Sequence, residues 1–289
     1  MKKILMIGMT DNMGGIETYI MNVYRNLKSK YVLYFPFVEN MAYKEEIETL
    51  GGKFIYGLPK SRRNPLAYYR AWDKAFKENR FDAVYFNNCD IVNLDVLKLA
   101  KKHKVSIRIF HAHSTSSNTI HYGMLHQLEA TFNKKRINKI ATHLFACSDE
   151  AGKYMFGVHP FQVIINGIDT QKYRFDEAKR NSTREELGIR QETVYLYVGR
   201  LEHIKNPLFM ADLIKCLHQL DENSIGLICG EGSLKAELEA KIAENQSGEY
   251  IRLLGNRTDL DCIYAAADFL IVPSFSEGMP FTLIEAQCS

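Results

Sequence analysis

Short apolar runs of strand length alternate with amphipathic stretches of helix length along the first part of the chain. The pattern begins with an apolar run over residues 3–9, a loop to Gly15 and a helical pattern over 16–27. Further strands are predicted over residues 31–38, 53–56, 83–86, 106–110, 143–146 and 161–165, with helices such as 65–79 and 90–102 between them. This alternation indicates a parallel sheet with helices on both faces.

The same alternation restarts after the turn-forming residues 166–169 and a polar stretch over 171–184. Strands are predicted over 193–198, 225–229, 250–254 and 269–272, and helices over 207–220, 234–245 and 259–266. The chain is therefore predicted to form an α/β protein of two facing Rossmann-like domains, residues 1–170 and 171–289, with a cleft between them. The second domain shows four strands and ends inside a helix that begins near Pro280, whereas doubly wound sheets commonly have about five or six, so we expect it to be incomplete.

Charge is divided unequally between the two predicted domains, although the whole chain of 289 residues carries only +3. Residues 1–170 hold 24 Lys+Arg against 15 Asp+Glu, a net +9, and residues 171–289 hold 13 against 19, a net −6. A basic half suits an anionic partner such as a membrane surface, phosphate or nucleic acid, with solvated lysines on an ordinary surface as the alternative. The basic residues are not interleaved with aromatic residues in any recognisable module, which disfavours nucleic acid.

Composition and processing signals point to a globular protein of the cytoplasm. Hydrophobic residues make up 46% of the chain and charged residues 25%, which disfavours disordered and fibrous classes. The six cysteines form no C-x-x-C pair and no metal-ligand spacing, so a reducing compartment is expected. The first apolar run is too short for a signal peptide, and no stretch approaches the roughly 20 apolar residues of a spanning helix.

A glycine pair, Gly14 and Gly15, follows the first predicted strand and precedes a helix. Backbone amides at such a helix start can approach a phosphate or a sugar, although a tight turn needed only for packing has the same pattern. A nicotinamide enzyme would have Gly-x-Gly-x-x-Gly here, a spacing that Gly8, Gly14 and Gly15 do not have. Glu39 after the second strand is the remaining support for a dinucleotide site.

Two histidines, His111 and His113, lie just past the predicted strand 106–110. An imidazole there can face the cleft as a hydrogen-bond donor or acceptor. A zinc site is disfavoured because the pair is two residues apart and no Cys, Asp or Glu nearby completes a ligand set.

A third cluster, residues 199–206, lies between the strand 193–198 and a helix that Pro207 can open as its first residue. It contains Gly199, and its Arg200 and Lys205 can converge on one anion. Arginine offers a planar fork and lysine a point charge, a pair suited to a departing diphosphate.

The strongest cluster is residues 276–285, in which seven residues separate Glu277 from Glu285. With Pro280 opening a helix, Glu277 lies in the loop before it and Glu285 about one turn inside, so both carboxylates can address one ligand over the helix N-terminus. Carboxylates accept hydrogen bonds from sugar and ribose hydroxyls, and the amides of residues 278–282 can receive phosphate oxygens.

One pattern raises the question of a metal. Asp259 and Asp261 form an Asp-x-Asp pattern, whose two carboxylates could hold a divalent cation. Here the pattern opens a helix after Thr258, so helix capping is the expected role and no metal is expected.

Taken together, these clusters make the chain resemble the retaining nucleotide-sugar glycosyltransferases of family 4, which have the GT-B fold, and most of all the bacterial subgroup that builds capsular polysaccharide and exopolysaccharide. The resemblance covers essentially the whole chain. It is carried by the glycine loop, the cleft histidine, the Arg/Lys pair and the two spaced glutamates. Residues 166–169 and 230–232 also fit the pattern of this family.

The resemblance implies a role for each cluster. The donor nucleotide would lie on the C-terminal domain, with Glu285 on the ribose and residues 254–256, including Asn256, on the base. Arg200 and Lys205 would stabilise the departing diphosphate, and His113, or His111, would contact the donor sugar. Glu277 would hold that sugar together with the backbone of Gly278, Met279, Pro280 and Phe281; Gly14, Gly15 and Gly199 complete the expected donor-binding set.

The expected function is hexosyl transfer from a nucleotide-diphosphate sugar, a UDP-sugar, to a lipid-linked or oligosaccharide acceptor, without a metal or other cofactor. The basic N-terminal domain would then contact an anionic membrane peripherally. Two alternatives remain: a truncated module that binds nucleotide sugar without turnover, and an NAD(P)-dependent oxidoreductase.

Overall fold

The computed structural model of the protein describes residues 1–59, 61–115 and 123–289. It divides into two compact units, Met1–Gly167 and Ile168–Ser289. The division falls within the turn-forming residues 166–169. None of the helices in the described ranges is long and apolar enough to cross a membrane.

The first unit is built on a parallel sheet of seven strands in the order β3-β2-β1-β4-β5-β6-β7. The strands are β1 (Lys2–Ile7), β2 (Tyr31–Pro36), β3 (Lys53–Ile55), β4 (Ala83–Asn88), β5 (Ile107–Ala112), β6 (His143–Ala146) and β7 (Gln162–Val163). The order reverses between β1 and β4, so the loops that follow these two strands diverge at the carboxyl edge, the usual ligand position in such sheets.

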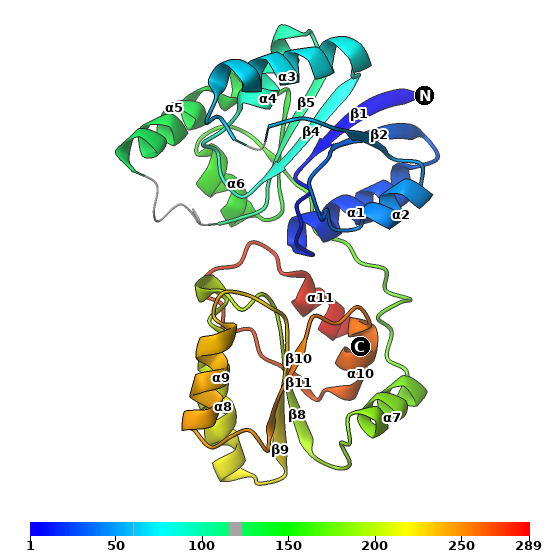
Figure 1. Ribbon diagram of the computed structural model, residues 1–289, viewed down its shortest axis with the longest axis vertical. Helices are drawn as coiled ribbons and strands as arrows, with labels where there is room; N and C mark the ends of the chain where they lie inside the picture. Colours follow the sequence, from blue (N-terminus) through cyan, green and yellow to red (C-terminus); the bar gives the residue numbers. More distant parts are fainter. Residues whose placement is uncertain (60, 116–122) are drawn as a thin grey trace. The chain divides into compact units, whose positions relative to one another are not determined.

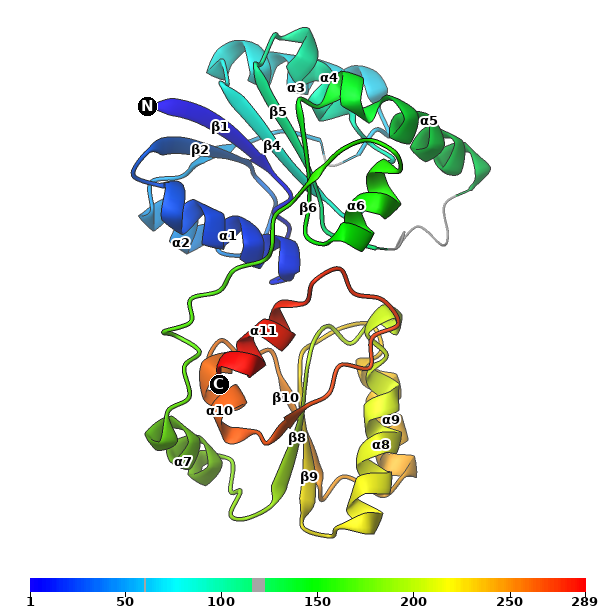
Figure 2. The ribbon, with the colours of Figure 1, turned by 180° about the vertical axis from the view of Figure 1, so that it is seen from behind.

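Helices cover both faces of this sheet, as Figures 1 and 2 show. They are α1 (Gly15–Leu27), α2 (Lys44–Thr49), α3 (Pro65–Asn79), α4 (Asp95–Lys102), α5 (Met124–Ile140) and α6 (Asp149–Phe156). Helices α1 and α2 lie together on one face, and α3, α4 and α5 lie side by side on the other. Because both faces are covered, β4 is buried over most of its length, which explains its continuous apolar run.

The second unit contains a parallel sheet in the order β10-β9-β8-β11. Its strands are β8 (Thr193–Val198), β9 (Ser224–Cys229), β10 (Ile251–Gly255) and β11 (Phe269–Leu270). Its helices are α7 (Glu177–Glu186), α8 (Pro207–Leu220), α9 (Lys235–Glu244), α10 (Leu260–Ala266) and α11 (Phe281–Cys288), with a short 3₁₀ turn, η1, at His203–Lys205. Helices α8 and α9 cover one face, and α7, α10 and α11 the other (Figure 1).

Alternation along β8 divides the core of the second unit between these two faces. Val194 and Leu196 pack with Ile263 of α10, whereas Tyr197 packs with Met210 of α8 on the opposite face. All of these side chains are almost fully buried. Alternate side chains of β8 therefore pack against helices on opposite faces of the sheet, and this packing fixes the strand end from which the next loop leaves.

Two predicted boundaries are wrong in ways that matter for function. Helix α4 begins at Asp95 rather than residue 90, because the Asp90 and Asn93 side chains accept hydrogen bonds from the backbone of Val92 and Asp95 and form turns. Strand β5 runs to Ala112 rather than residue 110. His111 therefore lies within the sheet.

Candidate functional site

The two clusters of the second unit meet at one place in its fold. The strand order of the sheet reverses between β8 and β11, which are hydrogen-bonded neighbours. The loop after β8 carries residues 199–206, and the loop after β11 carries residues 271–280. Both loops thus leave the carboxyl edge at the switch point, where open α/β sheets bind ligands.

An ion pair joins the two loops. Lys205 Nζ lies 2.5 Å from Glu277 Oε1, and both side chains are about one quarter exposed, at 24% and 23%. Two hydrogen bonds beside it hold the loops together: Phe275 N donates to Ile204 O at 3.0 Å, and Asn206 Nδ2 donates to Pro273 O at 3.4 Å. The sequence analysis placed Lys205 with Arg200 and did not foresee its partner.

Arg200 lies in the same loop as Lys205 and is exposed. Its carbonyl oxygen accepts a hydrogen bond from Tyr197 OH at 2.9 Å, which ties the loop to the end of β8. Burial raises the pKa of Tyr197, the Glu277 carboxylate raises it further and Arg200 lowers it. Both charges therefore act on the same phenol, so the structure brings Arg200, Lys205 and Glu277 together around the end of β8.

Close backbone packing holds the loop that carries Arg200. Gly199 N donates to Cys229 O, and Leu201 N donates to Glu231 O. Gly230 has φ +141°, and a Cβ at this position would lie 1.9 Å from Gly199 O. Only glycine fits at this crossing.

Glu285 occupies a different environment from Glu277. It lies in the second turn of α11, is 5% exposed, and accepts a hydrogen bond from Tyr264 OH at 2.9 Å. Burial raises the pKa of the Glu285 carboxyl, while hydrogen bonds from Tyr264 and Tyr173 oppose that rise. The predicted position of Glu285 inside the helix is confirmed; its tyrosine partners were not predicted.

The loop between Glu277 and α11 remains partly exposed, including Gly278 and Met279. Pro280 is the residue before the helix and has an extended backbone, and no side chain caps the helix there. Phe281 is 7% exposed and anchors the first turn in the core. The backbone amides at the start of α11 are thus available to an anionic or polar ligand.

Asn256 lies at the same edge of the sheet. It follows Gly255, the last residue of β10, and is exposed. Gly255 O accepts a hydrogen bond from Gly230 N at 2.8 Å, which connects this strand end to the glycine crossing. Asn256 is therefore held at the edge that carries the charged cluster.

The Asp-x-Asp pattern does not cap α10 through its side chains. Asp259 is the residue before α10, but its side chain makes no capping hydrogen bond. It binds Arg257 instead, with Arg257 Nε on Oδ1 at 2.9 Å and Nη2 on Oδ2 at 2.6 Å. Asp261 binds Lys179 Nζ at 2.6 Å. The expected capping role is wrong because nearby cations take both carboxylates.

In the first unit, the glycine pair begins α1 beside a buried carboxylate. Gly14 precedes the helix and Gly15 is its first residue. A Cβ on Gly14 would lie 2.8 Å from Glu17 Oε2, and Thr10 Oγ1 donates to Glu17 Oε1 at 2.5 Å. A carboxylate already occupies this helix start, which suits sugar hydroxyls better than phosphate and disfavours a dinucleotide.

The structure distinguishes the two histidines. His111 is fully buried in β5, where its Nδ1 lies 3.1 Å from Tyr85 OH, and burial lowers its pKa to about 2. His113 lies past the strand end and is partly exposed. Of the two, His113 is thus the histidine that a ligand can reach.

Asn87, which the sequence analysis missed, sets the hydrogen-bonding form of His113. Asn87 Nδ2 donates to Ile7 O at 3.0 Å, so its Oδ1 faces His113 Nε2, also at 3.0 Å. An amide oxygen can only accept, so Nε2 must carry a proton. Burial lowers the pKa of His113 to about 3, so the ring is neutral near pH 7 and Nδ1 keeps a lone pair that can accept from a ligand hydroxyl.

Comparison with known proteins covers both units. Residues 13–172 match the family model described as Glycosyltransferase Family 4, and residues 179–289 match the model described as Glycosyl transferases group 1. The chain is 30% identical over 301 residues to the Bacillus subtilis (strain 168) protein named "Putative glycosyltransferase EpsF", a match that covers 100% of this chain and 77% of that protein.

Two further similarities bear on chemistry and fold. An Escherichia coli UDP-Gal:alpha-D-GlcNAc-diphosphoundecaprenol alpha-1,3-galactosyltransferase is 34% identical over 129 residues, which are 43% of this chain and 33% of that protein. The crystal structure of Anabaena Alr3699/HepE in complex with UDP and glucose superposes with a TM-score of 0.81 at 17% identity, covering 100% of this chain and 78% of that one.

Proposed function

The chain belongs to glycosyltransferase family 4 and has the GT-B fold, and we propose that it transfers a hexosyl unit with retention from a UDP-sugar to a lipid-linked or oligosaccharide acceptor in surface polysaccharide synthesis. The similar Escherichia coli enzyme is named for a UDP-sugar donor and a diphosphoundecaprenol-linked acceptor. The similar Anabaena structure contains UDP and glucose. Both support this choice of substrates.

The observation that carries the proposal is the charged cluster at the switch point of the second unit. Lys205 has three N–H donors, one of which Glu277 uses, so two remain for diphosphate oxygens. Arg200 adds a second cation beside it. As the bond from the anomeric carbon to the diphosphate breaks, negative charge grows on the phosphate, and these cations stabilise it.

The remaining residues of this edge would bind the rest of the donor. Glu277 and the backbone at Gly278, Met279, Pro280 and Phe281 would hold the sugar. Glu285 would accept hydrogen bonds from the ribose hydroxyls. Its carboxylate would then bind both these hydroxyls and Tyr264 OH. Residues 254–256 would contact the base, and Gly199 would leave room for the donor beside Arg200.

In the first unit, we propose that His113 accepts a hydrogen bond from a sugar hydroxyl through Nδ1. Asn87 keeps the proton on Nε2 and so leaves Nδ1 as an acceptor. Gly14 and Gly15 would give a substrate hydroxyl access to the start of α1 and to the Glu17 carboxylate.

We propose that transfer requires no metal ion. Asp259 and Asp261, the aspartates with a metal-binding spacing, are already paired with Arg257 and Lys179. Activity should persist after exhaustive chelation with EDTA. A strict requirement for Mg²⁺ or Mn²⁺ would overturn this part of the proposal.

Titration and turnover together test the donor assignment. Isothermal titration with UDP, UDP-glucose and GDP-mannose is expected to show binding of a uridine nucleotide, and a donor-hydrolysis assay is expected to show release of UDP. Binding without hydrolysis or transfer would indicate a nucleotide-sugar-binding module. Preference for NAD(P)H over all three nucleotides would refute the proposal.

A lipid-linked acceptor would place the enzyme at a membrane surface. The net charge of +9 on residues 1–170 suits contact with anionic headgroups. We propose that this basic unit contacts the membrane peripherally.

A further inference from the structure

Helix α5 presents an unusual face to solvent. Four large apolar side chains on it are exposed: Met124 at 76%, Leu125 at 80%, Leu128 at 59% and Phe132 at 55%. Their spacing of one, four and eight residues from Met124 places them on one side of the helix. Single exposed apolar residues are ordinary, but four along one helix face form a patch that marks an interaction surface.

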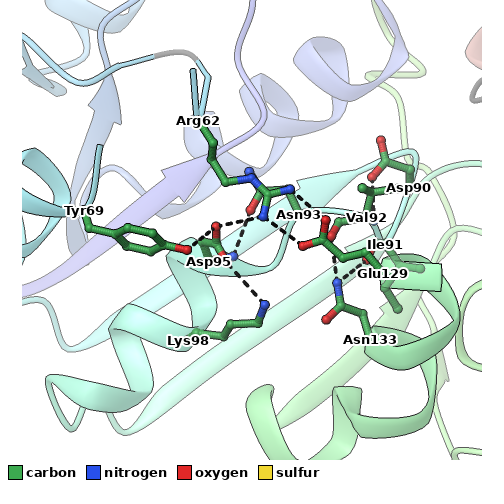
Figure 3. A network of polar contacts seen from close by, with 10 residues as sticks. All are labelled: Arg62, Tyr69, Asp90, Ile91, Val92, Asn93, Asp95, Lys98, Glu129 and Asn133. Atoms are coloured by element: carbon green, nitrogen blue, oxygen red, sulfur yellow. Dashed lines mark hydrogen bonds and ion pairs between the residues drawn. The ribbon is translucent and has the colours of Figure 1, made fainter. Parts of the chain in front are cut away.

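The opposite, inward side of α5 is polar where a soluble helix is usually apolar. Glu129 receives two hydrogen bonds of 2.8 Å from the Arg62 guanidinium, which also contacts Asp95 (Figure 3). Asp95 is 2% exposed and also accepts from Tyr69 OH at 2.8 Å and from Lys98 Nζ at 3.2 Å. The network ties the helix to the rest of the unit through charge and hydrogen bonding.

Asn133, one turn after Glu129, continues this polar inner side. It is 1% exposed, and its Nδ2 donates to Ile91 O at 3.0 Å and to Val92 O at 2.7 Å. Ile137, one further turn along, is fully buried. The helix is thus anchored by Glu129, Asn133 and Ile137, while four of its other large apolar residues point outward, contrary to the usual amphipathic arrangement.

The second half of the exposed side is basic. Three exposed cations lie here: Lys135, Arg136 and Lys139. Lys135 is seven residues after Leu128, and Arg136 and Lys139 are four and seven residues after Phe132. They therefore continue the apolar side along the helix. The Arg136 guanidinium lies 4.9 Å from the centre of the Phe132 ring, which joins the two halves. We call the seven residues 124, 125, 128, 132, 135, 136 and 139 the outer face of α5.

We infer that the outer face of α5 binds an anionic lipid bilayer. This inference rests on the proposed membrane contact of the first unit and names the surface that makes it. The apolar half would enter the interface between headgroups and acyl chains, and the three cations would contact anionic headgroups. Charge favours a bilayer over a second copy of the chain, because two such faces would bring six cations together.

Vesicle sedimentation with the whole protein tests the inference. The protein is expected to bind vesicles of equal parts phosphatidylcholine and phosphatidylglycerol at low salt, and to bind pure phosphatidylcholine vesicles much less. The triple variant K135Q/R136Q/K139Q should lower the partition coefficient about 100-fold, because each cation contributes a factor of about 5. It should also remove most of the salt dependence of binding. The matched triple variant K28Q/K30Q/K104Q, which removes exposed charges of the same unit elsewhere, should change it several-fold at most.

The apolar half is tested in the same assay. The double variant L128S/F132S should weaken vesicle binding at least about 10-fold at both low and high salt, because the variant loses apolar surface that would be buried in the bilayer, and salt does not screen this contribution. Its control is V158S/I165S, which removes two exposed apolar side chains of the same unit away from α5. All these side chains are exposed, so thermal unfolding of every variant should stay close to that of the unmodified protein.

A third measurement locates the contact on α5 itself. A tryptophan introduced as Leu125→Trp should shift its emission to the blue on anionic vesicles and be quenched by brominated lipid. The one native tryptophan, Trp72, is 5% exposed and should not respond.

Several outcomes would overturn the inference. One is equal vesicle binding by the outer-face variants and their controls, and another is no binding by the unmodified protein. Self-association in sedimentation velocity that L128S/F132S abolishes, without vesicle binding, would assign the face to a second copy. Failure of the proposed function is seen separately, in UDP titration and in transfer to a soluble acceptor without vesicles.

Discussion

The Lys205–Glu277 ion pair offers a sharp test of whether the charged cluster is catalytic or structural. The substitution Lys205→Met removes the charge and keeps most of the apolar stem. Both side chains are about three quarters buried, so this pair lies between exposed pairs, which contribute about 0–1 kcal/mol, and fully buried pairs, whose breaking costs about 3–5 kcal/mol; its loss should lower the free energy of unfolding by about 1–2 kcal/mol. For a two-unit chain of this size, that corresponds to a fall in Tm of about 2–8 °C.

The expected effect on the reaction is much larger. A cation that meets the diphosphate as its charge grows contributes about 2.7–4 kcal/mol to the transition state, so Lys205→Met should lower kcat/KM at least about 100-fold. The loss should appear in kcat as well as KM, since the contact strengthens as the leaving group forms. Steady-state transfer with UDP-glucose and a thermal scan measure the two quantities on the same preparation.

Lys241→Met is the matched control. Lys241 Nζ lies 2.5 Å from Asp212 Oδ2, and the Lys241 side chain is 30% exposed, so this pair resembles that of Lys205 in length and in the exposure of the lysine; it joins α8 and α9, and its carboxylate is 52% exposed. Its loss should lower Tm by the same amount or less and leave kcat/KM within about 2-fold. If Lys205→Met keeps a rate close to that of Lys241→Met, the cluster is structural and the proposed site is wrong.

Three further predictions concern His111, Gly230 and Glu285. His111 has a lowered pKa and stays neutral in the folded state, so it should lower the free energy of unfolding by up to about 1.4 kcal/mol per pH unit below about pH 6.5, and His113 adds a similar loss; a His111→Phe variant should show a shallower fall in pH-dependent thermal scans. Gly230→Ala should lower Tm by at least about 4 °C, whereas Gly248→Ala, where a Cβ meets nothing within 4 Å, should be nearly neutral. Glu285 has a raised pKa, so the unmodified protein loses stability as the pH rises through that value; Glu285→Gln should remove this loss in urea titrations at several pH values, yet lower kcat/KM at least about 100-fold.

Elements with strong local signals could be predicted closely from the sequence. Helix α3 runs over Pro65–Asn79 and α8 over Pro207–Leu220, as expected, because each has proline in its first turn, where the missing N–H costs nothing. Strands β6 and β8 also have their predicted bounds. In these places the local preference and the tertiary fold agree.

The boundary errors arise where polar side chains make hydrogen bonds that a hydrophobicity pattern does not show. Asp90 and Asn93 look compatible with a helix, but their side chains accept backbone hydrogen bonds and delay α4 until Asp95. His111 looks like the beginning of a loop, yet it lies inside β5 because Tyr85 on the neighbouring strand gives its ring a partner. The first effect is local but does not appear in the pattern of hydrophobic positions, and the second depends on a partner 26 residues away on another strand.

Most positions of the candidate site could be predicted, but their partners could not. Residues 199–206 and 276–285 were expected after strands because parallel sheets gather functional loops at strand ends. The contacts of Lys205 with Glu277 and of Tyr264 with Glu285 join residues that are 72 and 21 positions apart. Such pairing depends on how loops pack in three dimensions, and a single sequence does not contain that information.

Backbone packing explains how the second unit holds a charged cluster at a partly exposed edge. The crossing of residues 230–232 beneath residues 199–201 is possible because Gly230 and Gly232 have no Cβ, and a Cβ on Gly232 would lie 2.4 Å from Leu201 O. Arg200 is thereby positioned by main-chain hydrogen bonds, and its guanidinium does not have to anchor the loop. Because main-chain hydrogen bonds hold the loop, the Arg200 guanidinium is available to bind a ligand. This arrangement is why glycine substitutions at the crossing should lower the rate of transfer even though they touch no substrate.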